Sequence, residues 1–224
     1  MESWQKYLPE YRVKRWDEEN FDVNSVAYVK KAYESKKFAF VADYVRLHAL
    51  LHYGGIYLDT DTEIIRSLDD FLKYPAFLGF ESYNYVSAGI IGSEPDGMWV
   101  KEQLESYRNR HFIMADGKQD LTTIVQTFSR IMSGNGLLLN NTYQVYKEEM
   151  HVFPKDYFSP KSNTGVTNLT QNSVCIHHYA SSWEPLRLKF KRFFFQKILG
   201  PKLTDMLVKI KHKIIHNQHA GEND

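Results

Sequence analysis

The residues best suited to chemistry in this sequence are two aspartates separated by one residue, Asp59-Thr60-Asp61. Side chains two apart on an extended chain point the same way, so these carboxylates are expected to converge. They follow a short apolar stretch, Ile56–Leu58, and the glycine pair Gly54-Gly55. Carboxylates that converge where a strand ends form an oxygen-rich site for Mg²⁺ or Mn²⁺, which needs few protein ligands when phosphates complete the shell. The alternative is a solvated turn in which the aspartates only cap the backbone.

A second pair of charges precedes this turn. Asp43 and Arg46 are three residues apart, so they share one face of a helix. An exposed ion pair at this spacing contributes little to stability. The segment that carries them is strongly apolar, however, and a buried charge must be paired or bound to something polar. The spacing therefore leaves a functional pair and a surface ion pair both open.

Further candidates lie late in the chain. His177 and His178 are adjacent on a predicted strand, so only one of them faces a given side. One could be a third ligand to the same ion, or it could simply be hydrogen-bonded. Trp183 offers a flat apolar face and an N–H donor to a nucleotide or sugar, or it is a core residue. The sequence contains no nucleophile motif and no glycine-rich phosphate loop.

Hydrophobic periodicity places these residues in an α/β protein. A helical period runs through residues 38–53 and stops at Gly54-Gly55, because glycine accepts the left-handed conformation at a helix end. The acidic turn then lies at the carboxyl end of a strand, where open α/β sheets bind ligands. We expect a short helix at the N-terminus, a strand-like stretch around residues 11–16, helices at 24–37, 96–110 and 120–133, strands at 77–80, 87–92 and 174–180, and a long loop at 151–173.

Composition excludes several classes of protein. The 224 residues are 43% hydrophobic and 25% charged, which is typical of a soluble globular chain with a core. The net charge of +1 gives no support to nucleic-acid binding by the whole protein. The single cysteine, Cys175, fits a reducing compartment, and we find no membrane-spanning segment or signal-peptide core. These observations predict a cytoplasmic enzyme or binding protein.

The charge is distributed unevenly. Nine Lys/Arg residues lie between Arg187 and Lys213, against one acidic residue, Asp205. We therefore divide the chain into a body, residues 1–184, and a basic helical tail, residues 185–224. Lysines interleaved with apolar residues over 187–214 predict peripheral contact with an anionic membrane, which would place the protein at the inner face of the cell membrane. The alternative is a helix pair packed on the body or on a partner subunit.

The sequence FAFVADYVRLHALLHYGGIYLDTDTEIIRSLDDF resembles the conserved centre of the sugar-region glycosyltransferases that contain a DXD motif. That family includes initiating mannosyltransferases, α-1,4-galactosyltransferases and bacterial capsular polysaccharide transferases. Its pattern A-D-x-x-R…Y-G-G-I-Y-L-D-x-D is matched from Ala42 to Asp61, and residues 177–183 resemble its late H-H-x-x-x-S-W element. The resemblance implies a GT-A fold, a Rossmann-like α/β domain with a mixed sheet.

The resemblance also implies roles for individual residues. Asp59 and Asp61 would hold Mn²⁺ or Mg²⁺ on the donor diphosphate, with His177 as a further metal ligand. The sugar or ribose of the nucleotide would be bound by Asp43 and Arg46, and Asp43, Arg46 and Asp61 would form the catalytic set. The remaining implied donor contacts are Tyr57, Ser182 and Trp183.

The function that follows is a retaining hexosyl transfer from a nucleotide sugar to a bacterial surface polysaccharide or a lipid-linked glycan. UDP-hexoses and GDP-mannose are both open as donors. Members of the family usually begin with a strand ahead of the S-W found here as Ser3-Trp4, and this sequence lacks it. A non-catalytic nucleotide-binding or scaffold remnant is therefore the second hypothesis. A third is a phosphatase with a D-x-D-x-T motif, in which Asp59 attacks phosphorus and Asp61 acts as the acid.

Overall fold

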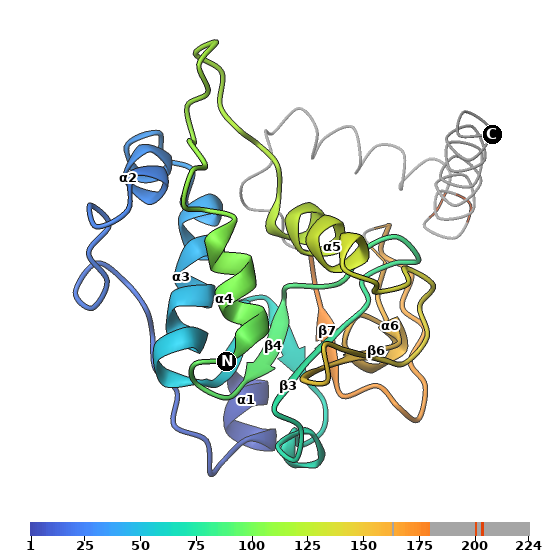
Figure 1. Ribbon diagram of the computed structural model, residues 1–224. Coiled ribbons are helices and arrows are strands. Elements are labelled where there is room, and N and C mark those ends of the chain that lie inside the picture. Colours follow the sequence, from blue (N-terminus) through green and yellow to red (C-terminus); the bar gives the residue numbers. More distant parts are fainter. Residues whose placement is uncertain (163, 180–199, 201–202, 204–224) are drawn as a thin grey trace, which may run out of the picture.

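A mixed five-stranded sheet forms the centre of the computed structural model, which describes residues 1–162, 164–179, 200 and 203 (Figure 1). The strand order is β1-β4-β3-β6-β5. Strands β3 and β6 are parallel, and the other neighbours are antiparallel. The mixed sheet agrees with the GT-A-like α/β fold expected from the sequence. The strands are β1 (Gly55–Leu58), β3 (Ala76–Gly79), β4 (Ile90–Ser93), β5 (Gln144–Tyr146) and β6 (Met150–Phe153).

A separate two-stranded sheet pairs β2 (Thr62–Ile64) with β7 (Cys175–His177) in antiparallel register. The helices flank these sheets, and α3 and α4 run alongside each other in Figure 1. They are α1 (Glu2–Tyr7), α2 (Ala27–Glu34), α3 (Phe38–Tyr53), α4 (Met98–Glu105), α5 (Ile124–Gly134) and α6 (Lys155–Phe158), with a 3₁₀ turn η1 (Asp69–Phe71).

The main sheet is buried on both faces. Leu78 of β3 and Ile91 of β4 belong to a large core formed with α2, α3, α4 and α5. Their neighbours Phe77 and Ile90 belong to a smaller core formed with α1, η1 and α6. Successive side chains of a strand point to opposite faces, so this division is the expected consequence of two covered faces.

The glycine pair ends α3 as predicted. Gly54 and Gly55 have φ angles of 62° and 91°, in the region that side-chain-bearing residues rarely adopt. The chain therefore turns sharply from α3 into β1. This turn places the acidic residues that follow β1 beside the helix that carries Asp43 and Arg46.

Three local expectations differ from the structure. Residues 11–16 form no strand; the Lys14 ammonium instead lies 4.2 Å from the Trp16 ring centroid and 3.8 Å from that of Tyr53, which holds the segment against the end of α3. The long loop expected at 151–173 begins with β6 and α6, because Val152, Phe153 and Phe158 are buried. Helix α4 ends at Glu105, earlier than residue 110.

Among the residues that the structure describes, no helix has the length and apolar character needed to cross a membrane. The basic tail at 185–224, with its predicted membrane contact, lies outside the described residues apart from Gly200 and Leu203. Ser182 and Trp183 also lie outside them.

Candidate active site

The acidic turn is anchored to the main sheet by its backbone. The N–H of Asp59 donates to the Gly89 carbonyl at 2.8 Å, which continues the pairing of β1 with β4. The N–H of Thr62 then donates to the Asp59 carbonyl at 2.9 Å and closes the turn. The two aspartate side chains are thus presented from a hydrogen-bonded turn at the end of β1.

The second sheet brings a histidine to this turn. In the pairing of β2 with β7, His177 lies opposite Thr62. The N–H of His178 donates to the Asp61 carbonyl at 3.1 Å, which fixes the two segments beyond the last strand pair. His178 itself faces the other way and contacts Glu63 at 2.8 Å. The alternation predicted for the two histidines is confirmed, and His177 is the one that faces the aspartates.

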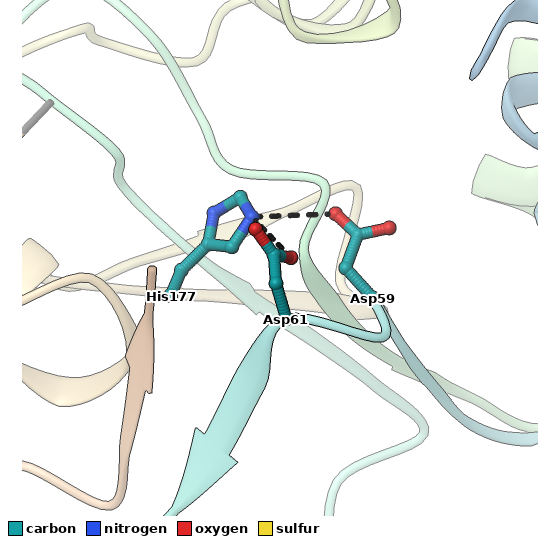
Figure 2. Close-up of side chains that lie close together, drawn as sticks. All are labelled: Asp59, Asp61 and His177. Atoms are coloured by element: carbon teal, nitrogen blue, oxygen red, sulfur yellow. Dashed lines mark ion pairs between the residues drawn. The ribbon is translucent and has the colours of Figure 1, made fainter. Parts of the chain in front are cut away.

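Asp59, Asp61 and His177 form a compact cluster (Figure 2). The Nε2 atom of His177 lies 3.1 Å from Asp61 Oδ1 and 3.6 Å from Asp59 Oδ2, and one ligand atom from each residue lies within 4.8 Å of the others. Two carboxylates and an imidazole fit a divalent cation. Because one donor is nitrogen, the set suits Mn²⁺ better than Mg²⁺, which prefers an all-oxygen shell.

The charges around His177 favour its protonated form. Burial lowers the pKa of His177, but the hydrogen bond to Asp61 and the negative charges of Asp59, Asp61 and Glu81 outweigh burial and raise it. A positively charged imidazolium thus offsets the acidic cluster when no cation does. The negative charges of these carboxylates would favour a bound cation in the same way.

The two oxygens of Asp59 face different partners. Oδ1 accepts a hydrogen bond from the Tyr57 hydroxyl at 2.7 Å and lies 3.3 Å from Nη1 of Arg46. Oδ2 faces His177. Burial raises the pKa of Tyr57, and the Asp59 charge raises it further against the effect of Arg46, so the hydroxyl stays protonated and donates. One oxygen is therefore held by the protein while the other faces the cluster.

Arg46 joins Asp59 to the buried carboxylate of Asp43. Its Nη2 lies 2.8 Å from Asp43 Oδ1, its Nη1 donates to the Ala88 carbonyl at 2.6 Å, and its guanidinium lies over the Tyr57 ring at 4.5 Å. Asp43 and Arg46 are 8% and 5% exposed, so the pair is not the surface ion pair left open by the spacing. Burial raises the pKa of Asp43 to about 6, although Arg46 and the backbone N–H of Ile124, at the start of α5, lower it.

Two further residues shape the candidate site, and no sequence motif predicts either of them. Glu81 lies just after β3, and burial raises its pKa while the charge of His177 lowers it. At Gly89, a Cβ atom would lie 3.1 Å from His177 Nδ1 and 3.3 Å from Asp59 Oδ2. A side chain at this position would crowd both candidate ligands. The small residues Ala88-Gly89 ahead of β4 are the one sequence feature that indicates a close approach of the backbone to another group.

The structure brings together six of the eight residues predicted for the site. Their individual roles in binding or catalysis stay predictions, as do those of Ser182 and Trp183, which are not among the described residues. The six are Asp43, Arg46, Tyr57, Asp59, Asp61 and His177.

The mixed α/β fold and this cluster are consistent with a GT-A-like glycosyltransferase domain, and comparison with known proteins agrees. Residues 1–78 match the family model described as a glycosyltransferase sugar-binding region containing a DXD motif. That part of the chain, which includes α3, β1 and the acidic turn, is therefore similar to the DXD glycosyltransferases.

The relatives found are fungal. A mannosyl phosphorylinositol ceramide synthase of Saccharomyces cerevisiae is 32% identical over 105 residues, covering 45% of this chain and 28% of the relative. A second synthase of the same name and organism is 41% identical over 75 residues, 32% of this chain and 20% of the relative. Glucan organizing enzyme 1 of Cryptococcus neoformans is 37% identical over 82 residues, 32% of this chain and 22% of the relative. The alignments thus cover about a quarter of the length of these relatives, and none supports the bacterial setting expected from the sequence.

Proposed function

We propose that this chain is a metal-dependent glycosyltransferase that moves a hexose from a nucleoside diphosphate sugar to a hydroxyl of a glycan or lipid-linked acceptor. The observation that carries the proposal is the convergence of Asp59, Asp61 and His177 at the carboxyl end of β1, within a region that matches the DXD family. Retention of the anomeric configuration is part of the proposal and rests on the family resemblance.

The cation would be held by Asp59, Asp61 and His177. When bound, it supplies positive charge against the negative charge that develops on the departing diphosphate. Tyr57 and Arg46 hold one oxygen of Asp59, so the other oxygen is oriented before the donor arrives. Such prior orientation lowers the reorganisation that binding would otherwise demand.

Mannose is the sugar to test first. Two of the relatives are named mannosyl phosphorylinositol ceramide synthases and a third, of Schizosaccharomyces pombe, is named inositol phosphoceramide mannosyltransferase 3. We therefore propose GDP-mannose as the first donor to examine, ahead of UDP-hexoses, and an acceptor with a sugar or cyclitol head group on a lipid. The membrane contact predicted for residues 187–214 would suit such an acceptor and rests on the sequence alone.

A calorimetric titration tests the nucleotide site. The chain is titrated with GDP-mannose and with UDP-hexoses in the presence of Mn²⁺, and again with EDTA. We expect binding of one donor that requires the cation, and loss of that binding in Asp61→Ala. His178→Ala is the matched control, because His178 is adjacent to the cluster but faces Glu63. Full donor turnover by Asp61→Ala would sink the proposal.

The same preparation separates the two alternatives. A non-catalytic remnant predicts that no donor is hydrolysed even at high protein concentration, so slow release of free sugar would remove that hypothesis. A phosphatase predicts Mg²⁺-dependent cleavage of an aryl phosphate that is lost in Asp59→Asn. Three helices, α1, α2 and α3, precede β1 and the acidic turn, whereas the phosphatase motif usually stands at the start of its domain. This difference favours the transferase.

A further inference from the structure

A polar cavity lies beside the candidate active site, where α4 ends and α5 begins. It measures about 400 Å³ and is lined entirely by polar side chains. In Figure 1 part of the chain between these helices extends away from the body. The lining residues are Ser106, Asn109, Arg110, Asp120, Thr122, Thr127 and Arg130.

Arg110, which lines the cavity, is held in place by several contacts. Arg110 bonds Asp120 at 2.7 Å and the Thr122 carbonyl at 2.7 Å, with a longer contact to Thr127 at 3.4 Å. Its guanidinium also lies over the rings of Tyr28 and Tyr107, at 4.9 and 5.2 Å. These contacts fix Arg110 and leave its charge balanced by Asp120.

Two other lining residues are available to a ligand. Asn109 and Arg130 are exposed, and neither side chain takes part in a hydrogen bond or ion pair within the described part of the chain. Together with the hydroxyls of Ser106 and Thr122, they offer both donors and acceptors. Polar surface predominates over apolar surface in the lining, which disfavours an apolar ligand, and a simple anion meets Asp120. A hydroxyl-rich ring, which donates and accepts around its whole edge, matches this lining.

The start of α5 relates the cavity to the candidate active site. Thr122, which lines the cavity, is two residues before Ile124, and the backbone N–H of Ile124 lowers the pKa of the Asp43 carboxyl. The rings of Tyr28 and Tyr107 lie under the guanidinium of Arg110, and their hydroxyls are buried without a hydrogen-bond partner among the described residues. The charges of Asp43 and Arg110 both act on the pKa of each tyrosine.

We propose that this cavity binds the sugar or cyclitol ring of the acceptor. This inference rests on the proposed glycosyltransferase function. Asn109 and Arg130 would bind the ring hydroxyls, while the ion pair of Arg110 with Asp120 shapes the pocket. Asp43, joined to the start of α5 on one side and to Arg46 and Asp59 on the other, would separate the acceptor from the donor site.

Direct binding tests the cavity without any turnover. Methyl α-mannopyranoside and myo-inositol are each added at about 10 mM, tenfold above a millimolar Kd, and contact with the protein is detected by saturation-transfer NMR. We expect a signal with the wild-type chain and its loss in the double variant Asn109→Ala/Arg130→Ala. Arg108→Ala is the control, because Arg108 is a neighbouring exposed arginine paired with Glu105 and does not line the cavity. No signal in the wild type, or an equal signal in the double variant, overturns the inference.

Kinetics separate this inference from the proposed function. In the double variant we expect the acceptor KM to rise about tenfold, the loss of roughly one net hydrogen bond, while metal-dependent donor hydrolysis stays within about twofold of wild type. If the double variant transfers sugar with an unchanged acceptor KM, the acceptor site is contradicted and the proposed transferase function stands. Ring binding without any donor hydrolysis contradicts the proposed function and leaves the cavity as a carbohydrate site.

Discussion

The imidazole of His177 lies 3.1 Å from the carboxylate of Asp61. Asp61 follows β1, the first strand of the main sheet, whereas His177 belongs to β7, the last described strand. The pairing of Thr62 with His177 in the small β2–β7 sheet creates this contact. A candidate metal site is thereby assembled from two distant parts of the chain.

The first prediction concerns cation binding to the cluster. Mn²⁺ at about 100 times its Kd should raise the free energy of unfolding of the wild-type chain by about 2.7 kcal/mol, because the unfolded chain has no preformed site. His177→Ala and Asp61→Asn should each lose most of this stabilisation. Denaturant unfolding with Mn²⁺ and with EDTA measures it, and His178→Ala should behave like wild type. Equal stabilisation of His177→Ala would remove His177 from the ligand set.

The second prediction concerns the Tyr57 hydroxyl. Tyr57→Phe keeps the ring under Arg46 but removes the hydrogen bond to Asp59 Oδ1, so Asp59 is less well oriented. Loss of such a supporting bond typically weakens metal affinity about 10- to 100-fold. Calorimetric titration with Mn²⁺ measures the change. Tyr11→Phe is a matched control, because it removes a tyrosine–aspartate hydrogen bond of 2.6 Å to Asp69, away from the cluster.

The third prediction concerns the buried ion pair. Arg46→Met leaves the Asp43 carboxylate buried without its cation and removes the bond to the Ala88 carbonyl. Loss of one partner from a buried pair costs about 3–5 kcal/mol, so the urea midpoint should fall substantially. Adding Asp43→Asn to this variant should recover part of the loss. Arg108→Met removes an exposed pair and should change stability by less than about 0.5 kcal/mol. A similarly small loss in Arg46→Met would show that the pair is not important for stability.

The fourth prediction concerns the pH dependence of stability. His48 packs against Trp16 and Phe21, and burial, with the charges of His52 and Lys14, lowers its pKa below 6.5. The folded chain therefore binds this proton less readily than the unfolded chain, so the contribution is complete above the unfolded pKa and is lost as the pH falls through the folded pKa. Unfolding at about pH 8 and about pH 5.5 should show a smaller loss of stability in His48→Gln than in wild type. An equal loss of stability in His48→Gln and in wild type would contradict the prediction.

Local patterns determined much of the fold. Helix α3, its glycine stop, β1 and the acidic turn were all predictable, because periodicity and turn chemistry act over a few residues. That the two histidines face opposite ways followed from strand alternation alone. Strand β5 escaped prediction, because three residues carry too weak a pattern, and β6 and α6 escaped within a segment whose prolines and glycine predict a loop.

The site itself needed the tertiary structure. Sequence spacing suggested that Asp43 and Arg46 share a face, but only packing decided that the pair is buried and that Arg46 reaches both Asp59 and the Ala88 carbonyl. Likewise, the residue types offered Asp59, Asp61 and one of two adjacent histidines as metal ligands, whereas the β2–β7 register decided that His177 is the one that meets the aspartates. The sequence by itself therefore determined which chemistry is available. The pairing of strands far apart in the chain, which depends on long-range contacts that no local pattern encodes, decided where that chemistry is assembled.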